Sequence, residues 1–226
     1  MTVETPDVYS HANPIFVREI VSRGAMPVVL DVGCWNGTLG RTLIRECGAI
    51  VDGIERDADQ AVTARANGYR VVDVADLDRE MPDAGGRSYD FILFGDVLEH
   101  LVHSSTALAN ISRRLKPGGS VLVSLPNIAF VGNRLSHLFG RWNYGDYGIL
   151  DRTHLRFFTK QTMIELLEGV DLHVMRVDGY VGLHRHPWIV REPLRFLGRV
   201  WPSLFAIQIV LSACARETPS FTSHQG

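Results

Sequence analysis

Acidic side chains stand at the ends of three successive apolar runs of this chain. Glu55 follows Ile50–Ile54, and Asp73 and Asp96 end the next two runs. In an open sheet of parallel strands, the carboxyl ends of the strands share one edge, and ligands bind there. A carboxylate at that edge accepts hydrogen bonds from hydroxyl or amino groups and can take up a proton. The spacing therefore predicts a polar-ligand site with acid or base chemistry beside it.

A glycine-rich turn precedes these acids and joins an apolar run, Val28–Leu30, to a helical pattern that continues to Cys47. The turn covers residues 31–37. A strand that opens into a helix through such a turn brings unpaired N–H groups and the positive end of a helix dipole to one point. We expect a ligand with an anionic or polar head to bind there.

The spacing of the glycines separates two classes of cofactor. A dinucleotide fingerprint, Gly-x-Gly-x-x-Gly, needs glycine where this chain has Trp35 and Thr38, or where it has Leu39 and Thr42. A nicotinamide-dependent oxidoreductase is therefore the disfavoured alternative.

Five short motifs follow one another along the chain: Leu30-Asp31-Val32-Gly33, Glu55, Asp73, Phe94-Gly95-Asp96-Val97-Leu98-Glu99-His100-Leu101 and Leu115-Lys116-Pro117-Gly118-Gly119. Together they resemble class I S-adenosylmethionine-dependent methyltransferases of the methyltransferase type 11/23 group, which are related to the ubiquinone-pathway O-methyltransferases. In that family the glycine turn passes under the amino-acid end of S-adenosylmethionine. The chain departs from the usual motif at Trp35, which stands where the family has a glycine.

The resemblance implies a role for each residue of the cofactor site. Glu55 accepts hydrogen bonds from the two ribose hydroxyls. Asp73 accepts from the adenine amino group while the Val74 N–H contacts the ring edge, and Asp76 is the rival for the role of Asp73. Asp96 lies near the reactive sulfonium. The cofactor-binding residues that the resemblance implies are Asp31, Gly33, Cys34, Trp35, Gly37, Glu55, Asp73, Val74 and Asp96.

The sulfonium already activates the methyl, so the protein needs chiefly to hold the acceptor in line behind it. A hydroxyl acceptor also needs a group that removes its proton. Asp96-x-x-Glu99-His100 is similar to the acid-x-x-Glu-His motif of the ubiquinone-pathway and small-RNA 2′-O-methyltransferases, some of which bind a divalent cation there. A later histidine completes the RNA-enzyme site, and His154 stands at a comparable distance. The resemblance thus implies a cation held by Asp96, Glu99, His100 and His154.

A second interpretation of the same residues needs no cation. His154 or His100 then acts as the base, with Asp96 beside the sulfonium. A third interpretation gives Glu99 and His100 only a role in fixing their loop by hydrogen bonds. The candidate catalytic residues are His154, His100 and Asp96.

The elements that position these residues alternate along the chain between apolar runs and helical patterns, which predicts an α/β fold with a parallel sheet covered on both faces. The resemblance implies a Rossmann-like, doubly wound, mostly parallel seven-stranded sheet, with the last strand antiparallel. We place that last strand at Leu204–Ala215. Ser104 or Ser105, and Thr159, are predicted helix caps.

Residues 1–216 are predicted to form one methyltransferase domain, followed by a disordered tail at 217–226. Within the domain, residues 127–158 depart from the alternation and are rich in Asn, Arg, Trp and Tyr. A long segment of that composition predicts a substrate-binding loop or lid.

Composition and charge indicate which classes of partner and which cellular compartment to expect. The net charge of −2 gives no basic excess for nucleic acid. Three separated cysteines and an N-terminus without an apolar run are typical of a cytoplasmic protein. The most apolar stretch, residues 204–215, is too short to cross a bilayer. The aromatic and basic stretch Trp188–Trp201 favours a helix packed on the sheet over a membrane contact.

The predicted function is O-methylation of a small-molecule or sugar-like acceptor by in-line transfer from S-adenosylmethionine. Methylation of nitrogen or carbon by the same site is one alternative. A non-catalytic protein that binds S-adenosylmethionine within a biosynthetic complex is the other, because the bulk of Trp35 would displace the methionine end. The acceptor and the oligomeric state have no signature in the sequence.

Overall fold

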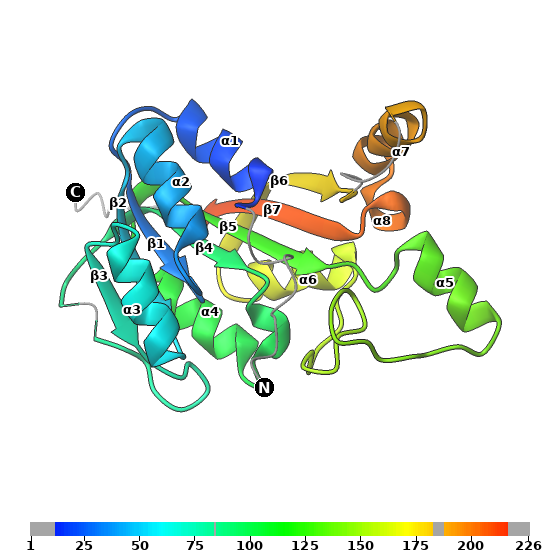
Figure 1. Ribbon diagram of the computed structural model, residues 1–226, viewed down its shortest axis with the longest axis horizontal. Helices are drawn as coiled ribbons and strands as arrows, with labels where there is room; N and C mark the ends of the chain where they lie inside the picture. Colours follow the sequence, from blue (N-terminus) through cyan, green and yellow to red (C-terminus); the bar gives the residue numbers. More distant parts are fainter. Residues whose placement is uncertain (1–11, 84, 183–187, 217–226) are drawn as a thin grey trace, which may run out of the picture.

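A seven-stranded sheet forms the centre of the computed structural model, which describes residues 12–83, 85–182 and 188–216 (Figure 1). The strand order is β3-β2-β1-β4-β5-β7-β6. The strands from β3 to β5 pair in parallel, and β7 runs antiparallel to both β5 and β6. The predicted fold class is confirmed. The strands are β1 (Val28–Val32), β2 (Ile50–Glu55), β3 (Val71–Val74), β4 (Tyr89–Gly95), β5 (Leu115–Pro126), β6 (Leu172–Tyr180) and β7 (Gln208–Ala215).

The strand order reverses beside β1, and this reversal creates the place for a ligand. The chain builds β2 and β3 on one side of β1 and then returns to add β4 on the other side. At such a switch point the connections leave β1 and β4 in opposite directions, so a crevice opens at their carboxyl ends. The glycine turn follows β1 and Asp96 follows β4. Both predicted parts of the site therefore lie at the carboxyl ends of two neighbouring strands.

Helices cover both faces of the sheet. Phe16 and Leu43, from α1 and α2, pack with α3 on one face, while Leu108 and Met163, from α4 and α6, pack on the other. The strands between them carry continuous apolar runs, as expected for a sheet buried on both sides. The helices are α1 (Pro14–Ser22), α2 (Thr38–Cys47), α3 (Ala58–Ala66), α4 (Ser104–Ser112), α5 (Val131–Leu138), α6 (Lys160–Glu168), α7 (Trp188–Val200) and α8 (Pro202–Phe205), and the 3₁₀ turn η2 is Leu98–His100.

One of the two predicted helix caps is confirmed. Thr159 caps α6 in a capping box with Thr162. The predicted cap at Ser104 or Ser105 is wrong, because α4 already begins at Ser104, after His103, which makes no side-chain cap bond. The carboxylate of Asp78 accepts the N–H groups of Val102 and His103 at 3.1 and 2.9 Å. A side chain more than twenty residues away in sequence thus fixes the two residues that lead into α4.

The last strand begins later than predicted. Residues 202–205 form the helical turn α8, and β7 starts at Gln208. Pro202 suits the first position of a helix because its ring fixes φ and its missing N–H would have no partner there. The buried amide of Asn127 donates to the carbonyls of Ser203 and Ala206 at 3.2 and 2.9 Å. Asn127 therefore joins the end of β5 to this turn.

Replacing Asn127 with alanine should lower the free energy of unfolding by about 2 kcal/mol, because it leaves buried carbonyls without a donor. Urea unfolding followed by circular dichroism measures the change. Exposed Asn143 offers a matched control whose alanine variant should stay within about 0.5 kcal/mol of the wild type. Equal stability of the two variants would contradict the role given to Asn127.

The segment 127–158 extends from one end of the sheet (Figure 1). It contains α5, each of whose residues is at least partly exposed, and a long loop that returns to α6. Among the described residues, no helix is long and apolar enough to span a membrane. The tail predicted at 217–226 lies outside the described residues.

Candidate cofactor site and active site

The glycine turn after β1 places three of its residues in the left-handed region of backbone space. The φ angles are +68° at Gly33, +48° at Trp35 and +79° at Gly37. A Cβ on Gly33 would lie 2.5 Å from a methyl of Val97, so glycine is required where the turn passes the end of β4. The conformation of Trp35 is uncommon for a residue other than glycine, and its side chain adds bulk to the turn.

Glu55 holds this turn in place. Its side chain lies at the end of β2, and the residue is only 7% exposed. One carboxylate oxygen accepts the Trp35 N–H at 2.8 Å and the other accepts the Asp57 N–H at 2.9 Å. Each oxygen keeps a second lone pair that is able to accept a ribose hydroxyl. Glu55 thus organises the turn, in addition to the cofactor contact expected from the sequence.

The two acids considered for the adenine contact have protein partners. Asp73, in β3, accepts a hydrogen bond from Arg87 at 2.9 Å. Asp76 accepts the Asp78 N–H at 3.1 Å. Val74 is paired in register with Glu55 and is exposed. The Val74 backbone therefore lies next to Glu55, the residue expected to hold the ribose. Adenine binding at Asp73 or Asp76 stays a prediction.

Asp96 lies just after β4, the strand that pairs with β1. It adopts a φ of +55°, which is rare for residues other than glycine. Gln208, at the start of β7, donates its amide to both carboxylate oxygens at 2.6 Å, and the Ser124 hydroxyl donates at 3.1 Å. Loss of hydration raises the pKa of Asp96 to about 6, while these two donors lower it. Asp96 is consequently held in one orientation by residues from β5 and β7.

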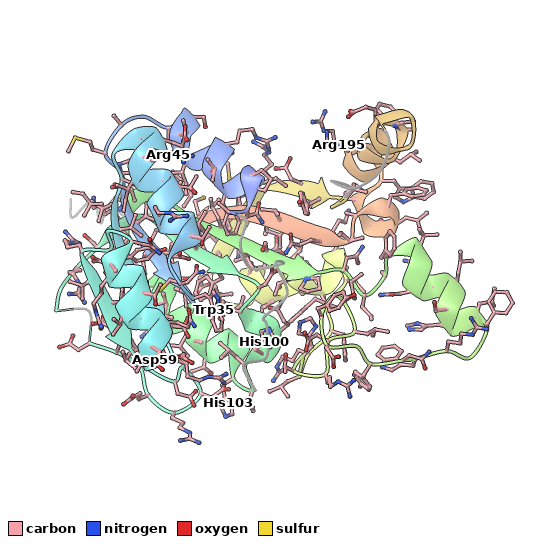
Figure 2. All side chains as sticks on the ribbon, viewed as in Figure 1. Trp35, Arg45, Asp59, His100, His103 and Arg195 are labelled. Carbon is pink, nitrogen blue, oxygen red and sulfur yellow. The ribbon has the colours of Figure 1, made fainter. Side chains whose placement is uncertain are left out.

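Glu99, His100 and His154 form a compact cluster beyond Asp96, and Figure 2 labels His100 within it. Glu99 is 1% exposed, and neither of its carboxylate oxygens accepts a hydrogen bond of normal geometry from the described residues. The His154 Nε2 lies 4.0 Å from a Glu99 oxygen. One ligand atom from each of the three residues lies within 4.8 Å of the other two.

Hydrogen bonds at the far side of each ring set the tautomers of this cluster. The Nδ1 of His100 lies 3.2 Å from the Thr153 carbonyl, and the Nδ1 of His154 lies 3.1 Å from the Ile149 carbonyl. A carbonyl accepts only, so each Nδ1 carries the hydrogen and each Nε2 keeps a lone pair. Burial lowers the pKa of His100, which favours its neutral form. Both rings can therefore act as bases or as metal ligands.

Residues 151–156 bring His154 to this position from far along the chain. The buried carboxylate of Asp151 accepts the N–H and the hydroxyl of Thr153 at 2.8 and 2.7 Å, which shapes the turn. The two residues after His154, Leu155 and Arg156, donate their N–H groups to the Glu99 carbonyl at 2.8 and 3.1 Å. The Arg156 side chain donates to the carbonyls of Leu101 and Val102. His154 is thus fixed against η2.

A chain of aromatic rings leads from α5 to the cluster. Trp142 stacks on His137 with ring centroids 4.4 Å apart and meets the edge of Phe157 at 5.3 Å. Phe157 in turn lies 6.4 Å from the ring of His154. Aromatic faces of this kind contact flat or ring-shaped ligands. The segment predicted to bind the acceptor therefore does border the cluster.

The structure brings most of the predicted site together and adds residues that the sequence did not indicate. The predicted cation ligand Asp96 is not among the three residues whose ligand atoms converge, although burial and then the charge of Asp96 raise the pKa of Glu99. Gln208 and Ser124 instead hold the Asp96 carboxylate. Gln208 had one signal, since it interrupts the apolar stretch before the last strand. Ser124 had none that sequence reasoning could use.

Comparisons with known proteins agree with this geometry. A methyltransferase domain family matches residues 16–177. The ubiquinone biosynthesis O-methyltransferase of Vibrio cholerae is 28% identical over 170 residues, covering 71% of this chain and 65% of that protein. That of Sodalis glossinidius is 29% identical over 191 residues, covering 78% and 72%. The match thus spans slightly less than two thirds of the length of the Vibrio protein.

Solved structures share the fold at low sequence identity. The CcbJ methyltransferase from Streptomyces caelestis superposes with a TM-score of 0.64 at 15% identity, covering 95% of this chain and 94% of that one. The [4+2]-cyclase SpnF superposes with 0.59 at 18% identity, covering 90% and 82%. A cyclase among these neighbours means that the fold alone does not determine the reaction. The family match settles the class, and the chain belongs to the S-adenosylmethionine-dependent methyltransferases.

Proposed function

We propose that the chain transfers the methyl group of S-adenosylmethionine, in line, to a hydroxyl oxygen of a small acceptor that carries a ring. The observation that supports an oxygen acceptor is the buried Glu99 carboxylate between two imidazoles at the end of β4. A hydroxyl must lose its proton as it is methylated, and these groups are able to accept that proton or to stabilise the charge that forms. The 28% identity to a ubiquinone biosynthesis O-methyltransferase favours the same acceptor atom.

The chain's own residues would supply three steps. The glycine turn and Glu55 hold the amino-acid end and the ribose, so that the methyl points toward the crevice. The aromatic rings of residues 137–157 hold the acceptor behind the methyl, and such positioning can contribute about 7–11 kcal/mol. His154 or His100 takes the hydroxyl proton on its free Nε2. The 127–158 segment is thus proposed as the acceptor-binding segment.

As the alternative to a base with a free Nε2, we propose that Glu99, His100 and His154 bind a divalent cation. A buried carboxylate that has no hydrogen-bond donor among the described residues, with a ring nitrogen of each of two imidazoles within 4.8 Å, is a donor set suited to Mn²⁺, Fe²⁺ or Zn²⁺. Each imidazole also donates its other N–H to a backbone carbonyl, as metal-binding histidines usually do. A bound cation would lower the pKa of an acceptor hydroxyl. Asp96 is not in this ligand set.

Titration with Mn²⁺ in a calorimeter tests the cation site. The wild type should bind with a measurable heat, and Glu99→Gln should bind at least about tenfold more weakly, because it loses the charged ligand. Asp146→Asn changes an exposed carboxylate in the 127–158 segment, which also contains His154, and should bind Mn²⁺ like the wild type. Equal binding by all three proteins would refute the site and leave the histidines as bases.

The activity itself is tested by release of S-adenosylhomocysteine in the presence of pooled small metabolites. Methylation that stops when hydroxyl acceptors are removed from the pool supports an oxygen acceptor. Turnover with amine acceptors alone would instead favour nitrogen methylation. Tight cofactor binding without turnover on any acceptor, with and without Mn²⁺, would favour the non-catalytic alternative.

A further inference from the structure

A buried tyrosine bonds to the first acid of the glycine turn. Tyr69 lies between α3 and β3 and is 4% exposed, and Asp31, in β1, is 3% exposed. The Tyr69 hydroxyl donates to the Asp31 carboxylate at 2.5 Å and accepts the N–H of Gly40 at 3.0 Å. Burial and the negative charge of Asp31 raise the pKa of Tyr69, so the phenol stays protonated and donates. One hydroxyl thus joins the end of β1 to the first turn of α2.

Three glycines leave the space that the Tyr69 ring fills. A Cβ on Gly40 would lie 2.3 Å from the ring, and one on Gly37 would lie 2.8 Å from it. A Cβ on Gly53, in β2, would lie 3.1 Å from the ring. The glycines of this region are therefore required by a side chain of the protein, as well as by the cofactor's approach.

The same segment contacts the glycine turn at a second point. The Asn67 amide donates to the carbonyl of Asn36 at 2.7 Å. Asn36, in turn, accepts the N–H of Thr38 at the start of α2. Residues 67–69 consequently support the turn from behind, both at its middle and at the helix that follows.

We propose that Tyr69 is a positioning residue for the cofactor: its hydroxyl fixes the Asp31 carboxylate beside the glycine turn, where that carboxylate attracts the α-ammonium of S-adenosylmethionine. The inference rests on S-adenosylmethionine being the cofactor, which the family establishes. It goes beyond the family motif, because Tyr69 lies outside every segment that carries the resemblance.

The charges around Asp31 give this arrangement a pH dependence. Asp31 faces the Tyr69 hydroxyl, the Glu55 carboxylate and the Cys34 thiol, and Arg65 lies near Cys34. Burial raises the pKa of Asp31 to about 7; the Tyr69 hydrogen bond lowers it and Glu55 raises it. Below that pH Asp31 becomes neutral and its attraction for an ammonium is lost. Cofactor affinity should therefore fall as the pH drops through about 7.

The test compares Tyr69→Phe with the wild type by calorimetric titration of S-adenosylhomocysteine between roughly pH 5.5 and 8.5. Phenylalanine keeps the ring among the glycines but removes the hydroxyl. We expect about tenfold weaker binding at neutral pH, and a midpoint of the pH dependence about one pH unit higher, because Asp31 loses a donor. A uniform loss of affinity with an unmoved midpoint would overturn the proposal.

Tyr89→Phe is a matched control. Tyr89 is also buried and also donates to a buried carboxylate, that of Asp52, at 3.1 Å, but it does so at the amino end of β4. This variant should lose stability without moving the midpoint of the pH dependence. A shift equal to that of Tyr69→Phe would show that the effect is not specific to the cofactor side, and would overturn the proposal.

Two measurements on the wild type stand if Tyr69→Phe fails to fold. Affinity for 5′-methylthioadenosine, which lacks the ammonium, should not change with pH, whereas affinity for S-adenosylhomocysteine should. The Gly40 amide resonance should shift with the same midpoint, because its acceptor is the Tyr69 hydroxyl. A Gly40 resonance that does not titrate, or equal pH dependence of the two ligands, would overturn the proposal. Failure of both ligands to bind would count against the cofactor assignment instead.

Discussion

Replacing Glu55 with alanine should weaken binding of S-adenosylhomocysteine by about 100-fold or more, the largest effect expected on the cofactor. The variant loses charge-assisted hydrogen bonds to the ribose, each contributing about 1.5–3 kcal/mol. It also releases the Trp35 and Asp57 N–H groups that the carboxylate accepts at 2.8 and 2.9 Å, so the glycine turn loses its support. Calorimetry with S-adenosylhomocysteine measures the loss.

Glu55→Gln sharpens this test, because a glutamine has the same shape and no charge. Both oxygens of Glu55 accept backbone N–H groups, and a glutamine amide has only one oxygen. One N–H would always face the NH₂ group, so glutamine should also bind poorly. Asp59, an exposed carboxylate in the first turn of α3, is the control. Its Asp59→Ala variant should bind S-adenosylhomocysteine as the wild type does. Near-normal affinity in either Glu55 variant would remove Glu55 from the cofactor site.

The fold and the cofactor edge could be predicted because they depend on local patterns. Uniformly apolar runs such as Phe91–Phe94 indicate strands buried on both faces, and the carboxyl ends of parallel strands must share an edge. Glu55 and Asp96 followed from that rule and from the order of the motifs. Thr159 was recognisable as a cap because its partner, Thr162, is three residues away.

The contacts that could not be predicted join residues far apart in sequence. Asp96 and Gln208 are 112 residues apart and meet only because β7 turns back beside β5. The Asp78 carboxylate fixes His103, the residue before α4, from 25 residues away in sequence. Tyr69 is isolated in the sequence, and its ring fits because positions 40 and 53, which are distant along the chain, are glycines.

Replacing His154 with alanine should lower methyl transfer by about 10²–10⁴-fold while leaving affinity for S-adenosylhomocysteine within about twofold. A cation site that includes His154 predicts this loss, and so does a mechanism in which His154, rather than His100, is the base, because its Nε2 lies beside Glu99. The cofactor contacts lie on the glycine turn and β2, so they should persist. Release of S-adenosylhomocysteine with pooled metabolites gives the rate, and calorimetry gives the affinity.

The two interpretations separate in the Glu99→Gln variant. If His154 acts only as a base, Glu99→Gln should keep much of the rate, because the imidazole lone pair is unchanged. If a cation is bound, Glu99→Gln should fall as far as His154→Ala, and added Mn²⁺ should restore the wild type after chelation. His173, exposed on the edge strand β6, is the control histidine. Its His173→Ala variant should keep the wild-type rate of methyl transfer. Unchanged turnover in His154→Ala with cofactor still bound would exclude His154 from the chemistry, because no other change in that variant compensates for a missing base or ligand.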